Sequence, residues 1–114
     1  MLPGLKSAGQ GALTPDLAVQ LINREKAVVV DICEPSEYAA GHVVGARNVP
    51  LSQLEAKLPA TVKNKALPVI LVCQSGARSS RALALAKKLG YENVHSLAGG
   101  LGAWRSAQLP IEKA

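Results

Sequence analysis

LPVILVCQSGARSSRALALAKKL, residues 67–89, brings an apolar run, a small polar loop and a helix-forming run into direct succession. This order predicts a strand, a loop at its carboxyl end and a helix. The N–H groups of such a loop and the positive end of the helix dipole converge on one point, beside Cys73. Arg78 adds a planar cation that suits an oxyanion. The stretch therefore predicts a nucleophilic Cys73 thiolate that faces a small anion.

Length and composition favour one α/β domain. The chain has 114 residues, enough for a single core. Hydrophobic residues make up 48% of it, but aromatic residues make up only 3% and Phe is absent. The core must therefore be built from Val, Leu, Ile and Ala, as in α/β sheets covered by helices.

Charge and cysteine content argue against a nucleic-acid-binding protein and against a zinc site. The net charge of +5 comes from basic residues scattered along the chain. A nucleic-acid surface would need clustered Lys and Arg with interleaved aromatic residues, so we expect no nucleic-acid partner. The two cysteines, Cys33 and Cys73, make no disulfide framework and lack the spacings of a zinc site. We expect no metal and no other cofactor.

The first twelve residues carry several glycines and show no periodicity, which predicts a flexible leader or a linker remnant. No segment approaches the roughly 20 apolar residues needed to cross a bilayer, and the start lacks the pattern of a secretory signal. We expect a cytoplasmic protein, or the soluble domain of a membrane-anchored protein whose N-terminal helix is absent from this sequence.

The rest of the chain alternates between helical and strand patterns. Thr14 and Pro15 predict the start of a first helix, which reaches Asn23. Ser52 to Glu55 matches a capping box that opens a short helix, and Pro59 is expected to help end it. The other predicted elements are strands at 27–32, 69–72 and 94–97, an extended piece at 45–50, and helices at 36–40, 79–89 and 101–107. This alternation predicts a parallel, doubly wound sheet with the Cys73 loop at its carboxyl edge, where ligands bind in such folds.

Three parts of the sequence together resemble the single-domain rhodaneses, a family of sulfurtransferases. They are VDICEPSEY (30–38) with GHVVGARNVP (41–50), the loop CQSGARS (73–79), and LAGGLGAW (97–104). The resemblance runs from about Thr14 to Glu112. It implies a rhodanese-like domain over residues 13–114, an α/β fold whose central, mostly parallel sheet has about five strands and carries helices on both faces.

The resemblance also implies a chemistry in which Cys73 is the catalytic residue. Cys73 would take a sulfane sulfur from a small anionic donor, thiosulfate or a persulfide, and would itself become a persulfide. It would then pass the outer sulfur to cyanide or a thiol, or to a protein sulfur acceptor. The substrate would be bound by the guanidinium group of Arg78 and by the amides of Gln74, Ser75, Gly76 and Ala77.

Three further residues are expected to support this site. Ser79 is expected to fix the loop and to cap the following helix. Asp31 precedes Cys33, which stands where the family usually has an arginine that makes an ion pair, so Asp31 must rely on backbone donors or another cation. His42 is expected to order its turn by hydrogen bonding rather than to act as a base. Cys33 is expected to be a structural residue, with disulfide formation to an oxidised Cys73 as the alternative.

Loop length favours sulfur transfer over phosphate chemistry. Four residues separate Cys73 from Arg78, and the phosphatases related to this fold have a longer loop that gives a tetrahedral phosphate more room. The alternatives are a partner-dependent persulfide relay, a non-catalytic rhodanese-like binding module and a small phosphatase. Retention of Cys73 argues against the binding module. We expect the chain to be a monomer.

Overall fold

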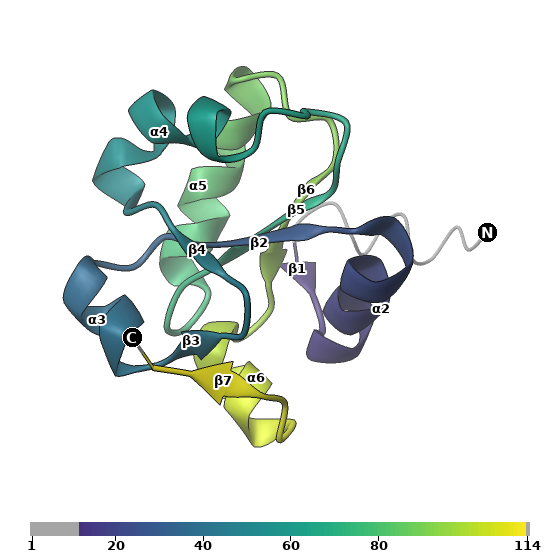
Figure 1. Cartoon of the computed structure of the whole chain (residues 1–114), viewed down its shortest axis with the longest axis vertical. Coiled ribbons are helices and arrows are strands. Elements are labelled where there is room, and N and C mark those ends of the chain that lie inside the picture. The colour runs from purple at the N-terminus through teal and green to yellow at the C-terminus, as the bar shows by residue number, and fades with distance from the viewer. Residues whose placement is uncertain (1–11, 114) are drawn as a thin grey trace.

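The computed structural model describes residues 12–113, which fold around a five-stranded sheet (Figure 1). Its strands are β1 (Ala12–Leu13), β2 (Val28–Asp31), β4 (Arg47–Asn48), β5 (Val69–Val72) and β6 (Val94–Leu97). They lie in the order β1-β6-β5-β2-β4, and each neighbouring pair is parallel. The predicted parallel α/β sheet of about five strands is confirmed.

Four helices cover this sheet, two on each face. They are α2 (Pro15–Glu25), α4 (Leu54–Thr61), α5 (Ala77–Lys88) and α6 (Gly100–Ser106). One hydrophobic cluster joins the sheet to α4 and α5, and a second joins it to α2 and α6. Helices therefore lie on both faces, as the sequence predicts.

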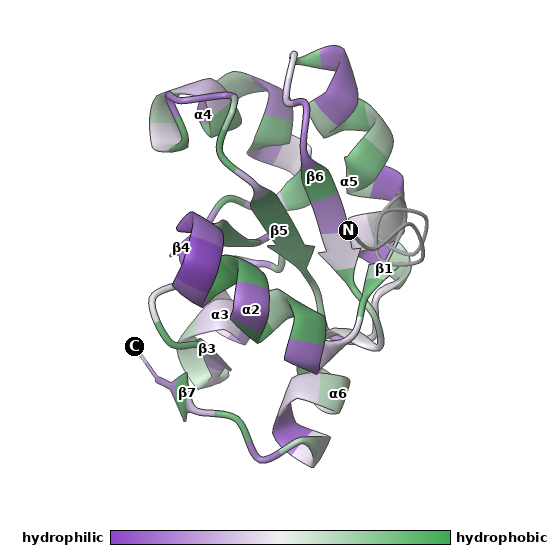
Figure 2. Cartoon of the chain, turned by 90° about the vertical axis from the view of Figure 1, so that its right-hand side faces the viewer, coloured by the Kyte–Doolittle hydropathy of each residue, from purple (hydrophilic) through white to green (hydrophobic). Residues whose placement is uncertain are grey.

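The residues of the central strand β5 explain why helices pack on both faces of the sheet. All four of its residues are buried, and Figure 2 shows the strand as hydrophobic along its length. Val69 and Leu71 belong to the cluster with α4 and α5, whereas Ile70 and Val72 belong to the cluster with α2 and α6. Successive side chains of a strand point to opposite faces, so a continuous apolar run requires a helical layer on each side.

The remaining elements lie around the carboxyl edge of the sheet. They are α3 (Pro35–Ala40), the 3-10 helix η1 (Leu51–Gln53), β3 (His42–Val43) and β7 (Ile111–Glu112). β3 and β7 form a small antiparallel ribbon that the sequence patterns do not predict. β3 follows α3 directly in the chain, and its pairing with β7 places the end of the described chain next to α3.

The start of α2 agrees with the sequence prediction, but the region of α4 does not. The hydroxyl of Thr14 accepts a hydrogen bond from the backbone N–H of Leu17 at 3.3 Å, as an N-cap does. Ser52 lies inside η1 and does not cap α4. The prediction that Pro59 helps end this helix was also wrong, because Pro59 lies inside α4. Pro59 removes one N–H donor from the helix, but the next turn still closes from Val62 N–H to the carbonyl oxygen of Leu58 at 2.8 Å.

Two predictions concern the ends of the chain and the membrane. The predicted leader lies outside the described residues except for Ala12, which begins β1 opposite Ser96 of β6. Among the helices formed by residues 12–113, none combines the length and the apolar character needed to cross a membrane.

Candidate active site

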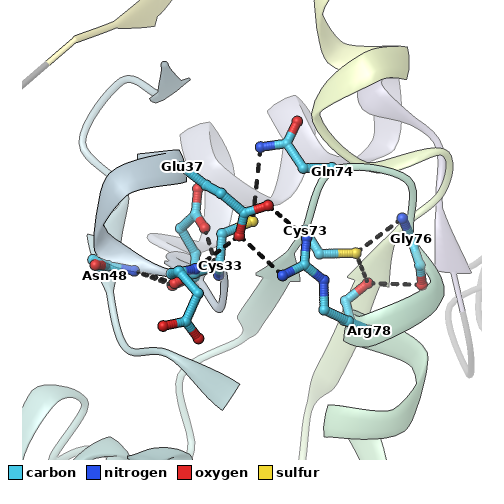
Figure 3. Close-up of polar contacts among 10 residues, drawn as sticks. Cys33, Glu37, Asn48, Cys73, Gln74, Gly76 and Arg78 are labelled. Atoms are coloured by element: carbon cyan, nitrogen blue, oxygen red, sulfur yellow. Dashed lines mark hydrogen bonds and ion pairs between the residues drawn. The ribbon is translucent and has the colours of Figure 1, made fainter. Parts of the chain in front are cut away.

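Cys73 directly follows β5 and lies at the base of the loop that leads into α5 (Figure 3). The residue is only 1% exposed. Its Sγ accepts a hydrogen bond from the backbone N–H of Gly76 at 2.9 Å and lies 3.8 Å from Oγ of Ser79. The strand, the loop and the first turn of the helix therefore converge on the sulfur, as the sequence predicts.

The surroundings of Cys73 favour its thiolate. Burial raises the pKa of the Cys73 thiol, but hydrogen bonds from Ser79, Gly76 and Ser75 outweigh burial and lower the pKa below its ordinary value. A thiol whose pKa is lowered carries more of the nucleophilic thiolate at neutral pH. Gln74, Ser75 and Ala77 are exposed on the loop around the sulfur.

Gly76 and Ser79 set the shape of the loop. Gly76 has φ of 99° and is the N-cap of α5, which begins at Ala77. Ser79 is thus the third residue of the helix, and the expectation that it is the N-cap was wrong. Its buried hydroxyl instead donates to the carbonyl oxygen of Gly76 at 3.1 Å. The helix starts earlier than predicted because a glycine can hold the left-handed conformation that turns the loop into it.

The loop is also held from behind by the start of α6. The N–H of Leu101 donates to the carbonyl oxygen of Cys73 at 2.8 Å, and the N–H of Gly102 donates to that of Gln74 at 3.2 Å. Gly100, with φ of 59°, lies so close that a Cβ there would collide with backbone atoms of Cys73 and Gln74. Gly100 of the sequence motif at 97–104 therefore has a packing role at the Cys73 loop.

Arg78 is paired with Glu37, a residue that the sequence analysis does not single out. Nη1 and Nη2 of Arg78 donate to the two carboxylate oxygens of Glu37 at 2.9 and 3.1 Å. Oε1 of Glu37 also accepts the N–H of Glu34, which lies at the start of α3. The side chains of Arg78 and Glu37 are 36% and 33% exposed. The spacing of Glu34 and Glu37 around Pro35 is the sequence signal that could have drawn attention to Glu37.

Asp31 and Cys33 are buried next to the Cys73 loop. Oδ1 of Asp31 accepts the N–H of Cys33 at 2.9 Å, so of the two expected kinds of partner, a backbone donor or a cation, the structure shows the backbone donor. The side-chain amide of Asn48 bridges the carbonyl oxygens of Asp31 and Cys33 at 3.0 and 2.9 Å. Burial raises the pKa of Asp31, and burial with the neighbouring Asp31 charge raises the pKa of Cys33 to about 12. Cys33 is therefore a neutral thiol at ordinary pH, with Nε2 of Gln74 3.9 Å from its Sγ.

His42 orders the turn after α3. Its Nδ1 lies 2.7 Å from the carbonyl oxygen of Tyr38 and its ring stacks on that of Tyr38, with centroids 3.6 Å apart. Its Nε2 lies 3.4 Å from a carboxylate oxygen of Glu112 in β7. These contacts agree with the structural role that the sequence predicts for His42. Within the described part of the chain, no group of three or more His, Cys, Asp or Glu residues is arranged to hold a metal ion.

The rhodanese-like domain family matches residues 14–107 of this chain. The chain belongs to the rhodanese family. A thiosulfate sulfurtransferase named GlpE from Pseudomonas putida is 36% identical over 104 residues, which cover 90% of each chain. The crystal structure of a thiosulfate sulfurtransferase from Pseudomonas aeruginosa superposes with a TM-score of 0.80 at 29% identity, over 90% of this chain and 20% of that one.

An uncharacterized protein from Bacillus subtilis, YqhL, is 42% identical over 79 residues. The match covers 69% of this chain and 61% of that protein, so the chain spans about three fifths of this relative. Together with the rhodanese match, the named sulfurtransferases support a sulfurtransferase-like function for the domain.

Proposed function

We propose that this chain transfers a sulfane sulfur from thiosulfate or a persulfide donor, through a persulfide on Cys73, to a thiophilic acceptor. The observation that carries the proposal is the hydrogen bond from Gly76 N–H to Sγ of Cys73, together with the lowered pKa of that thiol. Attack on a sulfane sulfur needs a thiolate, and the negative charge that remains on the outer sulfur needs N–H donors.

In the first step, the Cys73 thiolate attacks the outer sulfur of thiosulfate. A bond forms between the two sulfurs, the S–S bond of thiosulfate breaks, and sulfite leaves with the electron pair. The loop amides of Gln74, Ser75, Gly76 and Ala77 are proposed to hold the persulfide anion. Arg78 is proposed to bind the oxygens of the donor with the N–H groups that it does not give to Glu37.

In the second step, cyanide or a thiolate attacks the outer sulfur of the persulfide. The new bond forms as the S–S bond to Cys73 breaks, which releases thiocyanate or a new persulfide and restores the thiolate. No separate base is required, because both attacking groups are anions. The proposed partners are thus a small anionic donor and a cyanide, thiol or protein acceptor, with the chain acting as a monomer.

Mass spectrometry of the purified protein tests this proposal. Thiosulfate should add one sulfur atom to Cys73, and cyanide should remove it with release of thiocyanate. Cys73→Ser should take up no sulfur, whereas Cys33→Ser should react like the unchanged protein. Absence of the adduct in a protein whose Cys73 still reacts with an alkylating agent would contradict transfer from thiosulfate.

The same experiment separates the alternatives. An adduct that forms only from a protein persulfide would indicate a partner-dependent relay. No adduct from any donor would favour a binding module, and hydrolysis of an aryl phosphate that depends on Cys73 would favour a small phosphatase.

A further inference from the structure

The positive charge of Arg78 is balanced by the negative charge of Glu37. Both terminal nitrogens of Arg78 are bound to the two carboxylate oxygens of Glu37, from α3 (Figure 3). The hydrogen bond from Arg78, and then the N–H of Glu34, lower the pKa of Glu37, so the carboxylate is ionised at neutral pH. The guanidinium group of Arg78 keeps further N–H donors, but together with the Glu37 carboxylate it carries little net positive charge.

Three described groups near the pair, Asp31, Cys33 and Cys73, carry no positive charge. Asp31 is an acid, and Cys33 is held as a neutral thiol. Cys73 contributes a negative charge once it is a thiolate, which is the form required for attack. A donor with two negative charges therefore gains little more from Arg78 than a donor with one.

We propose that Glu37 is a specificity-determining residue that makes the site favour monoanionic sulfane donors over the dianion thiosulfate. The inference rests on the proposed sulfur transfer and names its substrate class, which is thiosulfonates and the persulfide anions of uncharged thiols. Glu37 acts through Arg78. Its carboxylate offsets the positive charge of the guanidinium group, so a second negative charge on the donor adds little attraction to the site.

Two small sulfur donors allow the effect of donor charge to be measured with the same reacting group. Thiosulfate and methanethiosulfonate both offer a terminal sulfane sulfur, and they carry two negative charges and one. With either donor the Cys73 thiolate forms a bond to that sulfur while the bond to the sulfonyl sulfur breaks. Sulfite leaves from thiosulfate and methanesulfinate leaves from methanethiosulfonate, each with the electron pair, and the product on the enzyme is the same persulfide.

The test compares the rates of persulfide formation on Cys73 in the full chain and in Glu37→Gln. Glutamine keeps an oxygen that can accept from Arg78 and from Glu34 N–H but removes the charge. We expect the rate constant with thiosulfate to rise about fivefold and that with methanethiosulfonate to rise about twofold, since the interaction energy with a fixed charge is proportional to the charge of the donor. The thiosulfate gain should shrink at high salt, where Arg78 is screened.

Two variants serve as controls. Glu37→Asp keeps the charge and should leave the ratio of the two rates near that of the unchanged protein. Glu55→Gln removes an acid from the exposed first turn of α4 and should alter neither rate.

Three results would overturn the inference. If Glu37→Gln changed both rates by the same factor, Glu37 would only position Arg78. A fall in the thiosulfate rate alone would show that the pair, and not free Arg78, binds the dianion. If neither donor modified Cys73 in the unchanged protein, the proposed sulfur transfer would fail as well, a result that the first two do not produce.

Discussion

Oγ of Ser79 lies 3.8 Å from Sγ of Cys73, on a buried side chain that also holds the carbonyl oxygen of Gly76. One serine thus contacts the sulfur of Cys73 and also binds the loop beside it. Ser79 contributes through both its backbone and its side chain to the lowering of the Cys73 pKa, against the effect of burial.

Ser79→Ala should therefore raise the pKa of Cys73. The expected observation is a shift to higher pH in the profile of Cys73 alkylation by iodoacetamide, because less thiolate is present at each pH. Ser52→Ala, which changes an exposed serine of η1, is the matched control and should leave the profile in place. An unshifted profile in Ser79→Ala would remove the hydroxyl from the account of Cys73 reactivity.

The two cysteines should differ strongly in reactivity. Because the pKa of Cys33 is raised to about 12, its thiolate fraction at pH 8 is on the order of one in ten thousand. Iodoacetamide should label Cys73 alone in the folded protein and both thiols in urea, as read by peptide mapping. Cys73→Ser should take up no label until it unfolds. Labelling of Cys33 in the folded chain at a similar rate would contradict its buried, neutral state.

Gly100→Ala should destabilise the protein and disturb the loop. A Cβ at this position collides with the backbone of Cys73 and Gln74, and the residue also has a positive φ, so we expect a loss of about 2 kcal/mol or more in the free energy of unfolding. Gly45→Ala is a suitable control, since its φ is 83° but no atom lies within 4 Å of the added Cβ. It should cost about 1 kcal/mol. Urea unfolding measures both, and equal losses would contradict the close approach.

Asp31→Asn should increase the free energy of unfolding relative to the unchanged protein, and this increase should become larger as the pH rises. Burial raises the pKa of Asp31 in the folded protein above its value of 3.8. Between the unfolded and the folded pKa the folded state holds more protons than the unfolded state, so the stability of the unchanged protein falls with pH in that window. Asparagine has no charge to bury and can still accept the N–H of Cys33. The difference in unfolding free energy between variant and parent should grow from pH 3.5 to pH 7, and a constant difference would show that the burial of the charge is not costly.

The strand, loop and helix of residues 67–89 could be predicted from the sequence because their signals are local. A continuous apolar run requires burial on both faces, and β5 has it. The loop residues lie within a few positions of Cys73, so their backbone groups must converge near the sulfur. Serine is a common N-cap, so the sequence favours Ser79 at the start of α5, whereas Gly76 takes that position through its left-handed backbone.

Contacts between distant segments could not be predicted in this way. Glu37 and Arg78 are 41 residues apart and meet only because α3 and α5 follow the neighbouring strands β2 and β5. The support of the loop by Leu101 likewise depends on β6 lying beside β5. Sequence patterns identify the residues of such a pair, and the order of the strands decides which of them touch.

The N–H groups of Leu101 and Gly102, which hold the carbonyl oxygens of Cys73 and Gln74, also set an order of events during synthesis. A ribosome makes Cys73 almost thirty residues before it makes α6, so the growing chain carries the cysteine without the backing that fixes its loop. The fully assembled site exists only when nearly the whole domain has left the ribosome. Incomplete chains that end before α6 therefore lack the two hydrogen bonds that hold the Cys73 loop from behind.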